Sequence, residues 1–296
     1  MSEIVKAFDY NAQGVFRILQ FTDLHLITTE RPAEFQQTLS LIRRTAAATK
    51  PDLIVMTGDL TWGETMDDKD AMDILADTMA EIAVPWAPVL GNHDGDRIGR
   101  DTFASFLLDR PYSLFTLGDS EAEGHGNYIV SVSDDWYLYF MDSHTGAFFP
   151  GQLDWYRRTS AAFPEAHREL AFFHVPLPEY VEVWDYEQCK GFNMEGVCCT
   201  ELNDGLFSAF VRGGHMRGVF VGHDHLDDFE GTLHGIRLTY GRLSGYQCYG
   251  MECFPRGARM IDLRKGDDDY ITRIYLETGE MYFQERLSKP TLRRRN

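Results

Sequence analysis

The chain has 296 residues and a formal net charge of −18, with 44% apolar and 13% aromatic residues. This apolar content is ordinary for a globular protein and supplies a sizeable core. The acidic balance argues against a nucleic-acid polymer as partner, because like-charged polyanions repel each other.

Alternating strand and helix patterns open the chain. Residues 15–22 (VFRILQFT) predict a strand, and residues 34–49 predict an amphipathic helix that stops before Pro51. The run LIVMT at 53–57 is typical of a short buried strand, and it is followed by a predicted helix over 68–83 and a strand over 85–90. This order predicts a strand-helix-strand-helix arrangement in the first third of the chain.

The later chain mixes hairpins with further alternation. The strands predicted at 127–133 and 136–142 are separated by a short polar turn, which favours antiparallel neighbours. A helix is predicted over 151–163, strands over 169–174 and 217–222 with a helix near 202–212 between them, and several short strands over 228–276. We therefore expect a mixed α/β layered fold, with two sheets, in a single domain over residues 1–285.

No apolar run approaches the roughly 18 residues of a membrane span, and the first residues lack the pattern of a secretory signal. We therefore expect a cytoplasmic protein with no membrane partner. Five cysteines without a C-x-x-C motif disfavour both a disulfide framework and a thiolate zinc site, and most of them are predicted to be small buried apolar groups. The basic tail at 286–296 is predicted to be a flexible end.

Polar side chains of metal-ligating type follow the predicted strands. Because open α/β sheets form their sites beyond the carboxyl ends of strands, these side chains are expected to meet. The set comprises Asp23 and His25 in FTDLHL, Asp59 in TGDL, Asn92, His93 and Asp94 in LGNHD, His174 in FFHVP, and His223 and His225 in VGHDH.

This set favours transition metals. Carboxylates, an amide oxygen and imidazoles suit Zn, Mn, Fe or Co rather than Ca or Mg held by oxygen alone. Seven ligands exceed the needs of one tetrahedral ion, but they suit two ions that share a carboxylate. The alternative for any one residue, a buried histidine or an ordinary turn aspartate, loses weight because the whole set occurs in order at strand ends.

The ordered blocks D-x-H, G-D, G-N-H-D, H and G-H-x-H resemble the calcineurin-like metallophosphoesterase superfamily. The segments ELNDGLF, GHDHLDDFEG, YGRLSGYQCYG and FPRGAR are similar to single-domain purple acid phosphatase-like proteins. The resemblance implies a four-layer α-β-β-α sandwich with two mixed sheets. It also implies hydrolysis of a phosphate ester by a hydroxide held between two metal ions, Fe, Mn or Zn.

The resemblance implies a role for each residue. Asp23, His25 and His225 would hold the first metal, Asp59 would bridge both, and Asn92, His174 and His223 would complete the second. His93 resembles the proton donor to the leaving group, and Asp94 its orienting partner. Weaker candidates are Arg97 and His144 as substrate contacts and Arg242 and Tyr246 at a pocket mouth, while Asp224, Asp227 and Asp228 are expected to be solvated or strand-capping.

One departure concerns the metal. Purple acid phosphatases carry a tyrosine ligand three residues after the bridging aspartate, where this chain has Trp62, and their first block is D-x-G. A tyrosinate-to-iron colour is therefore not expected, and a stable ferric ion is in doubt. Three functions remain open: a phosphomonoesterase acting on a small ester or a phosphoprotein, a phosphodiesterase acting for instance on cyclic nucleotides, and an inactive metal-binding scaffold.

Overall fold

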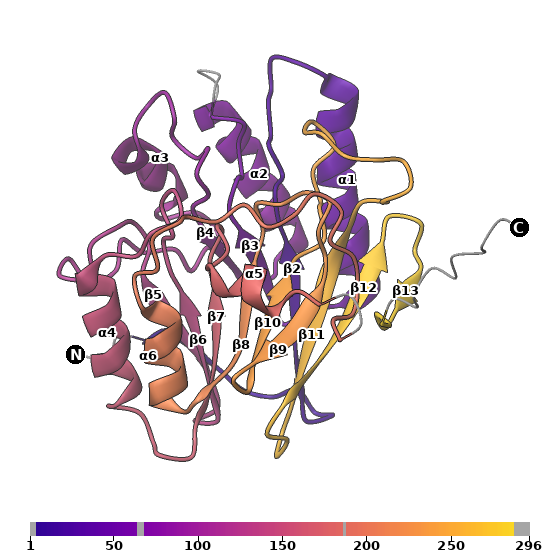
Figure 1. Ribbon diagram of the computed structural model, residues 1–296. Helices are drawn as coiled ribbons and strands as arrows, with labels where there is room; N and C mark the ends of the chain where they lie inside the picture. Colours follow the sequence, from indigo (N-terminus) through magenta and orange to yellow (C-terminus); the bar gives the residue numbers. More distant parts are fainter. Residues whose placement is uncertain (1–3, 64–67, 186–187, 287–296) are drawn as a thin grey trace, which may run out of the picture.

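A computed structural model describes residues 4–63, 68–185 and 188–286 (Figure 1). Two mixed β-sheets pack against each other, and helices cover the outer face of each sheet. The strands are β1 (Ile4–Phe8), β2 (Val15–Phe21), β3 (Leu53–Thr57), β4 (Trp86–Val89), β5 (Tyr128–Val132), β6 (Trp136–Phe140), β7 (Arg168–Phe172), β8 (Met216–Val221), β9 (Glu230–Leu233), β10 (Ile236–Tyr240), β11 (Gly257–Arg264), β12 (Tyr270–Leu276) and β13 (Met281–Tyr282). The helices are α1 (Pro32–Thr49), α2 (Asp68–Ile82), α3 (Arg100–Leu107), α4 (Pro150–Ser160), α5 (Glu179–Val183) and α6 (Leu206–Gly213).

The six-stranded sheet has the order β13-β12-β11-β2-β3-β4. Strands β2, β3 and β4 are parallel because α1 and α2 return the chain to the same end of the sheet. Helix α1 ends at Thr49, and Lys50 adopts a left-handed conformation before Pro51, as the sequence predicts.

The seven-stranded sheet has the order β1-β5-β6-β7-β8-β10-β9. The predicted hairpin of β5 and β6 is antiparallel, whereas β6, β7, β8 and β10 run parallel to one another. The carboxyl ends of the parallel strands of both sheets meet at one end of the molecule, since the backbone N–H of His223, after β8, donates to the carboxylate of Asp23, after β2.

Two buried apolar clusters hold the four layers together. One joins both sheets to α1, α2 and α3, and its members include Ile18 and Val55 from the first sheet and Phe172 and Phe220 from the second. The other packs α4, α5 and α6 onto the outer face of the seven-stranded sheet through residues such as Phe210. The predicted two-sheet, four-layer architecture is therefore confirmed, and its apolar burial is the main favourable term in the folding of such a chain.

Some elements differ from the sequence expectation. Strand β1 and helices α3 and α5 were not predicted, because β1 is a largely exposed edge strand and the two helices are short. Within 228–276, β11 and β12 are not short, since they have 8 and 7 residues. The tail beyond residue 286 lies outside the described residues.

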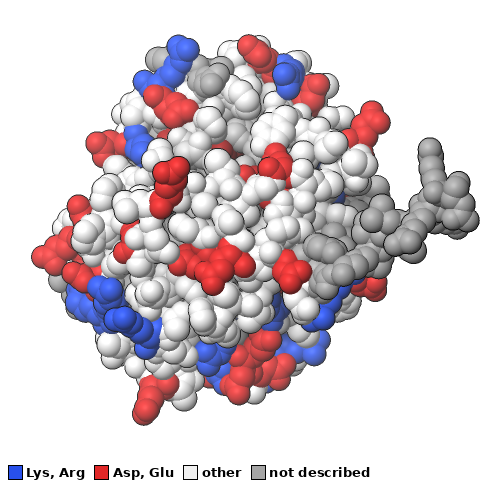
Figure 2. Space-filling view, in the orientation of Figure 1, with Lys and Arg blue, Asp and Glu red and all other residues white. Residues whose placement is uncertain are grey.

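The cysteine prediction is wrong for most members. Cys189 and Cys248 are buried, but Cys198 and Cys253 are exposed and Cys199 is half-buried, although all five lie in loops. No helix in the described ranges combines the length and the apolar character needed to cross a membrane. On the face seen in Figure 2, acidic side chains are dispersed among uncharged surface, in line with the negative net charge.

Candidate metal centre

All seven predicted ligands converge at the carboxyl ends of the parallel strands. Asp23 and His25 follow β2, Asp59 follows β3, Asn92 follows β4, His174 follows β7, and His223 and His225 follow β8. Five of them are almost fully buried: Asp23, His25, Asp59, His174 and His225. Buried charged groups of both signs are costly unless they pair or bind a cation, so their accumulation here needs a specific reason.

The first ligand group surrounds His25. Its Nε2 lies 3.2 Å from Nε2 of His225 and 3.4 Å from Oδ2 of Asp59. Nε2 of His225 is in turn 3.6 Å from Oδ1 of Asp23. Two imidazole nitrogens and two carboxylates that face one another at these distances suit one shared cation.

The second ligand group surrounds His174. Its Nε2 lies 3.2 Å from Oδ2 of Asp59 and 3.0 Å from Oδ1 of Asn92. Asp59, His174 and His223 offer ligand atoms that lie within 4.8 Å of one another. The same Oδ2 of Asp59 therefore faces both groups, which is the arrangement of a bridging carboxylate.

Hydrogen bonds to neighbouring backbone orient these side chains. Nδ1 of His174 lies 2.8 Å from the carbonyl oxygen of Thr57, and Nδ1 of His225 lies 3.3 Å from that of Tyr249. Since a carbonyl only accepts, each Nδ1 carries a proton and each Nε2 is directed at the centre. The Asp23 carboxylate accepts hydrogen bonds from the backbone of His223 and the hydroxyl of Thr22.

Strained backbone marks the ligand positions. Asp23, His25, Asp59 and His223 adopt positive φ angles of 54°, 46°, 49° and 79°. A non-glycine residue in this region costs about 1–3 kcal/mol, and such strain persists where the surrounding structure enforces it, often at functional sites. The turns after β2, β3 and β8 are thus shaped to direct side chains inward.

Two carboxylate–imidazole ion pairs form within the centre, Asp59 with His174 and Asp23 with His225. Burial alone would raise the pKa of Asp59, but the charge and the hydrogen bond of His174 outweigh it and hold that pKa well below its usual range. Burial would lower the pKa of His174, but the negative charge of Asp59 outweighs burial and raises that pKa to about 9. In the same way, contact with Asp23 outweighs burial and raises the pKa of His225 to about 11.

The other two imidazoles remain neutral. Burial lowers the pKa of His25 and of His223 to about 4 in each case. Nδ1 of His25 is buried without a hydrogen-bond partner among the described residues. Two ionised carboxylates, an amide oxygen and neutral imidazoles with unused nitrogens are a donor set that fits two divalent transition-metal ions.

His93 lies at the edge of this centre. Its ring centroid is 5.6 Å from that of His25, and its backbone N–H donates to Oδ1 of Asp59 at 2.9 Å. The ring is about one third exposed and lies beside the indole of Trp62, with nearly parallel planes. The imidazole can therefore reach a bound substrate from solvent-accessible space.

The ring partner of His93 is Asp96 rather than the predicted Asp94. Nδ1 of His93 lies 2.9 Å from Oδ2 of Asp96. The buried carboxylate of Asp94 instead accepts hydrogen bonds from the backbone of Thr61 and Gly91, at 3.0 and 2.8 Å. Asp94 thereby ties the loop after β3 to the loop after β4, because its side chain points into the protein and that of Asp96 points outward.

The two candidate substrate contacts occupy different surroundings. Arg97 is exposed in the turn after Asp96. His144 is half-buried, with Nε2 3.5 Å from Oδ2 of Asp142. Asp142 is fully buried and also binds Arg100 and the backbone N–H groups of His125 and His144.

The sequence analysis did not single out Asp142. Asp142 follows β6 in the run WYLYFMD, so the signal that singled out Asp23 and Asp59, an aspartate just beyond a strand, was present. Burial raises the pKa of Asp142, but the hydrogen bond with His125 and the charge of Arg100 outweigh it and lower that pKa to about 2. Arg100 also donates to the carbonyl oxygen of Gly91, which connects this cluster to the loop of Asn92.

The acidic residues after β8 are structural rather than solvated. Asp224 accepts from Tyr240 and from the backbone of Cys198, Asp227 accepts from the backbone of Met194, and Asp228 pairs with Arg242. These carboxylates hold the segment 192–198 beside the centre.

The prediction of a pocket-mouth role for Arg242 is wrong. The side chain is buried and lies over the ring of Phe254, because its guanidinium pairs with buried Asp228. Tyr246 is half-buried, and its hydroxyl donates to Glu277.

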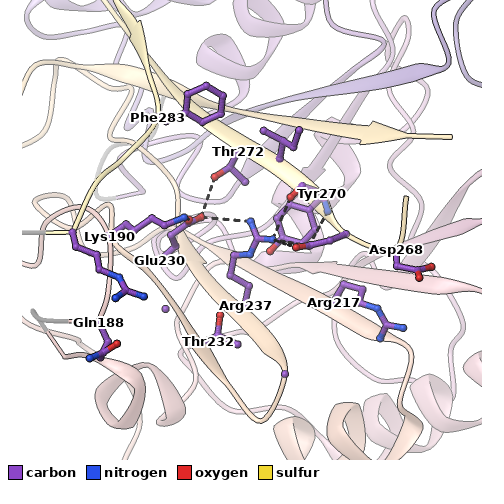
Figure 3. Close-up of a pocket in the computed structure, with 15 residues that line it drawn as sticks. Gln188, Lys190, Arg217, Glu230, Thr232, Arg237, Asp268, Tyr270, Thr272 and Phe283 are labelled. Atoms are coloured by element: carbon purple, nitrogen blue, oxygen red, sulfur yellow. Dashed lines mark hydrogen bonds and ion pairs between the residues drawn. The ribbon is translucent and has the colours of Figure 1, made fainter. Parts of the chain in front are cut away.

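A cavity of about 850 Å³ lies away from this centre, between β9–β10 and β12–β13 (Figure 3). Arg237 projects into it and pairs with Asp269 at 2.6 Å, while its guanidinium lies 4.0 Å from the centre of the Tyr270 ring. Its lining contains no predicted ligand, so the chemistry is assigned to the strand ends rather than to this cavity.

Comparisons with known proteins agree with the geometry. The sequence model of the calcineurin-like phosphoesterase family matches residues 16–227, which is more than half of the chain and includes all seven ligands. The chain belongs to this family. Its members depend on a dinuclear metal centre, and the ligand groups after β2, β3, β4, β7 and β8 fit that requirement.

Individual relatives cover most of the chain. It is 31% identical to a protein of Arabidopsis thaliana named probable inactive purple acid phosphatase 14, over 87% of this chain and 79% of that one. It is 30% identical to the 3',5'-cyclic adenosine monophosphate phosphodiesterase CpdA of Escherichia coli, over 75% and 74%. A dimetal phosphatase of Danio rerio shares the fold with a TM-score of 0.61 at 13% identity, over 87% of this chain and 98% of that one.

Proposed function

We propose that this phosphoesterase hydrolyses phosphomonoesters with two divalent metal ions, Fe, Mn or Zn, held by the seven ligands. The observation that carries the proposal is the position of Oδ2 of Asp59, which faces His25 of one group and His174 of the other at 3.4 and 3.2 Å. Because seven ligand side chains exceed the needs of one tetrahedral ion, a carboxylate oxygen that faces both groups suits two ions that share it. The substrate is a phosphate ester carried by a small molecule or by a phosphoprotein.

The bound ions would polarise the phosphoryl oxygens, neutralise the charge that develops on them and activate water at neutral pH. The side chains of the protein supply the rest. His93 would give a proton to the leaving oxygen, and Asp96, whose Oδ2 lies 2.9 Å from Nδ1 of His93, would orient the ring. Asp94 fixes the loop of Asp59 relative to the loop of Asn92, because it accepts hydrogen bonds from the backbone of Thr61 and Gly91.

A monoesterase is favoured over a diesterase by the segments after β8. These segments resemble the purple acid phosphatase branch, and the Arabidopsis relative named for that class matches over 87% of this chain. Diester hydrolysis is the alternative, because the relative named as a cyclic nucleotide phosphodiesterase matches over 75% of the chain.

An inactive scaffold is the third reading, and the printed name of the Arabidopsis relative includes the word inactive. The chain itself argues against it. All seven ligands are retained and converge, and His93 keeps both its position beside His25 and a carboxylate partner. Loss of activity in such a site normally accompanies loss of a ligand or of the proton donor.

Hydrolysis of an aryl phosphate and of the corresponding bis-aryl diester, measured on protein loaded with Fe, Mn or Zn, tests the proposal. We expect faster turnover of the monoester, two ions bound for each chain, and loss of both properties in Asp59→Ala. Faster turnover of the diester would replace the monoesterase by the alternative. Two bound ions without hydrolysis of either ester would support the scaffold.

A further inference from the structure

A cysteine thiol lies beside the first ligand group. Cys248 is 6% exposed, and its Sγ and nitrogens of His25 and His225 lie within 4.8 Å of one another. The three residues come from different parts of the chain, the turn after β2, the turn after β8 and the loop between β10 and β11. Cys248 therefore lies outside the segments that carry the family motifs.

The loop that carries Cys248 is fixed to both ligand-bearing turns. The backbone N–H of Gly245 donates to the carbonyl oxygen of Asp23, and the Gln247 side chain binds the backbone N–H and carbonyl of Ile27. Tyr249 stacks on the ring of His225 with centroids 4.0 Å apart. The position of the sulfur is thus set by contacts on both sides of it in the sequence.

The polar contacts of the thiol are weak. Its Sγ lies 3.7 Å from the carbonyl oxygen of Asp23 and 3.5 Å from that of Gly245, and S–H is a poor donor. Nδ1 of the neighbouring His25, which is 2% exposed, has no hydrogen-bond partner among the described residues. Nε2 of His25, rather than this nitrogen, faces His225 and Asp59. A buried thiol without a strong hydrogen bond, in one group with two imidazoles, has the surroundings of a metal ligand.

We propose that Cys248 is a further ligand of the first metal ion, which it binds as a thiolate together with Asp23, His25 and His225. On binding, the S–H proton is released to solvent and a sulfur–metal bond forms. The inference rests on the proposed dinuclear site and deepens it, because it assigns that site a soft ligand. A soft thiolate favours Zn or ferrous iron over Mn, whereas the nitrogen and oxygen ligands alone leave this choice open.

The chain offers a reason for an added anion at this ion. Trp62 stands where purple acid phosphatases place a tyrosine ligand, and its ring lies 5.2 Å from that of His25. An indole cannot ionise to provide an anionic oxygen. The Cys248 thiolate restores one negative charge beside the same imidazole.

Cobalt substitution tests the sulfur–metal bond directly. The full chain is freed of metal, loaded with two equivalents of Co²⁺, and its near-ultraviolet and visible absorption is recorded. A thiolate ligand gives a sulfur-to-cobalt charge-transfer band, which nitrogen and oxygen ligands do not give. We expect this band in the wild-type protein, its loss in Cys248→Ser and Cys248→Ala, and its retention in Cys198→Ser.

Cys198 is the matched control because its thiol belongs to a group with His223 and Asp224, on the side of the second ion. A band that disappears in Cys198→Ser and persists in Cys248→Ser would overturn the inference. Competition between Zn²⁺ and Mn²⁺ provides a second readout, in which Cys248→Ser is expected to lose about 10- to 100-fold of the preference for Zn²⁺.

The wild-type spectrum tests whether a thiolate binds the metal even if a Cys248 variant fails to fold. Two bound cobalt ions with phosphate-ester hydrolysis but without the band would defeat the thiolate assignment and leave the proposed function intact. A chain that binds no cobalt and hydrolyses no ester would defeat both.

Discussion

Replacement of Gly91 by alanine tests whether the position of Asp59 governs the centre. The backbone of Gly91 has a φ that alanine tolerates, so the perturbation is steric. A Cβ at this position would lie 2.1 Å from Oδ1, 2.2 Å from the backbone nitrogen and 2.8 Å from Cγ of Asp59. Real Cβ contacts essentially never fall below 3.0 Å, so Asp59 or the loop of Gly91 must shift by nearly 1 Å.

The size of that shift sets the expected loss. A displacement of about 1 Å in a catalytic group can cost about 100-fold in rate, and overpacking of a buried site costs about 1–3 kcal/mol of folding free energy. We expect Gly91→Ala to lower kcat/KM for an aryl phosphate by about 100-fold or more and to bind fewer than two ions. The assays are steady-state hydrolysis and metal analysis of the same preparation.

Gly266→Ala is the matched control. Gly266 lies in the turn between β11 and β12 with φ 87°, and no atom lies within 4 Å of a Cβ placed there. This variant should lose stability through backbone strain but keep its metal and its rate. Wild-type rates and two bound ions in Gly91→Ala would refute the reasoning, because they would mean that Asp59 need not hold its position.

Asp59→Ala should abolish turnover and metal loading together. His93→Ala should lower kcat by about 100- to 10,000-fold while the metal content stays normal. A normal metal content and a normal rate in Asp59→Ala would contradict this pair of expectations. Asp96→Asn should lower kcat less than His93→Ala does, and a wild-type kcat in Asp96→Asn would separate Asp96 from the proton donor. Asp142→Asn should cost about 2 kcal/mol, or about 5 °C in Tm, near pH 7, since the pKa of Asp142 falls from 3.8 to about 2 on folding. That stability is present above pH 3.8 and is lost as the pH falls toward 2, so urea unfolding of both proteins at descending pH should show the difference shrink. The carboxylates of Asp142, 3.7 Å from Nδ1, and of Asp101, 2.6 Å from Nε2, raise the pKa of His125 above 6.5. Their contribution to stability is complete below pH 6.5 and is lost as the pH rises through the raised value. Thermal melts of His125→Gln should therefore approach those of the wild-type protein at alkaline pH, and a constant difference would count against this pairing.

The fold class and the candidate ligand set could be predicted from the amino-acid sequence. The apolar runs that became β2, β3, β4, β7 and β8 are each followed within a few residues by a carboxylate, amide or imidazole. Parallel strands separated by helices place their carboxyl ends at one edge of a sheet, so Asp23, Asp59 and Asn92, which follow β2, β3 and β4, reach the same edge. This inference needs only the periodicity of the chain and the chemistry of its side chains.

Which side-chain atoms face each other could not be predicted without the three-dimensional fold. Asp94 and Asp96 both follow His93 in the run GNHDGD, and only the path of the loop turns Asp96 toward His93 and buries Asp94 against the loop of Thr61. The proximity of Cys248 to His25 depends on the loop between β10 and β11 lying over the end of β2, a contact between residues more than 200 positions apart. Side-chain direction beyond a strand end is set by loop dihedral angles and by sheet stacking, and neither leaves a periodic signal in the sequence.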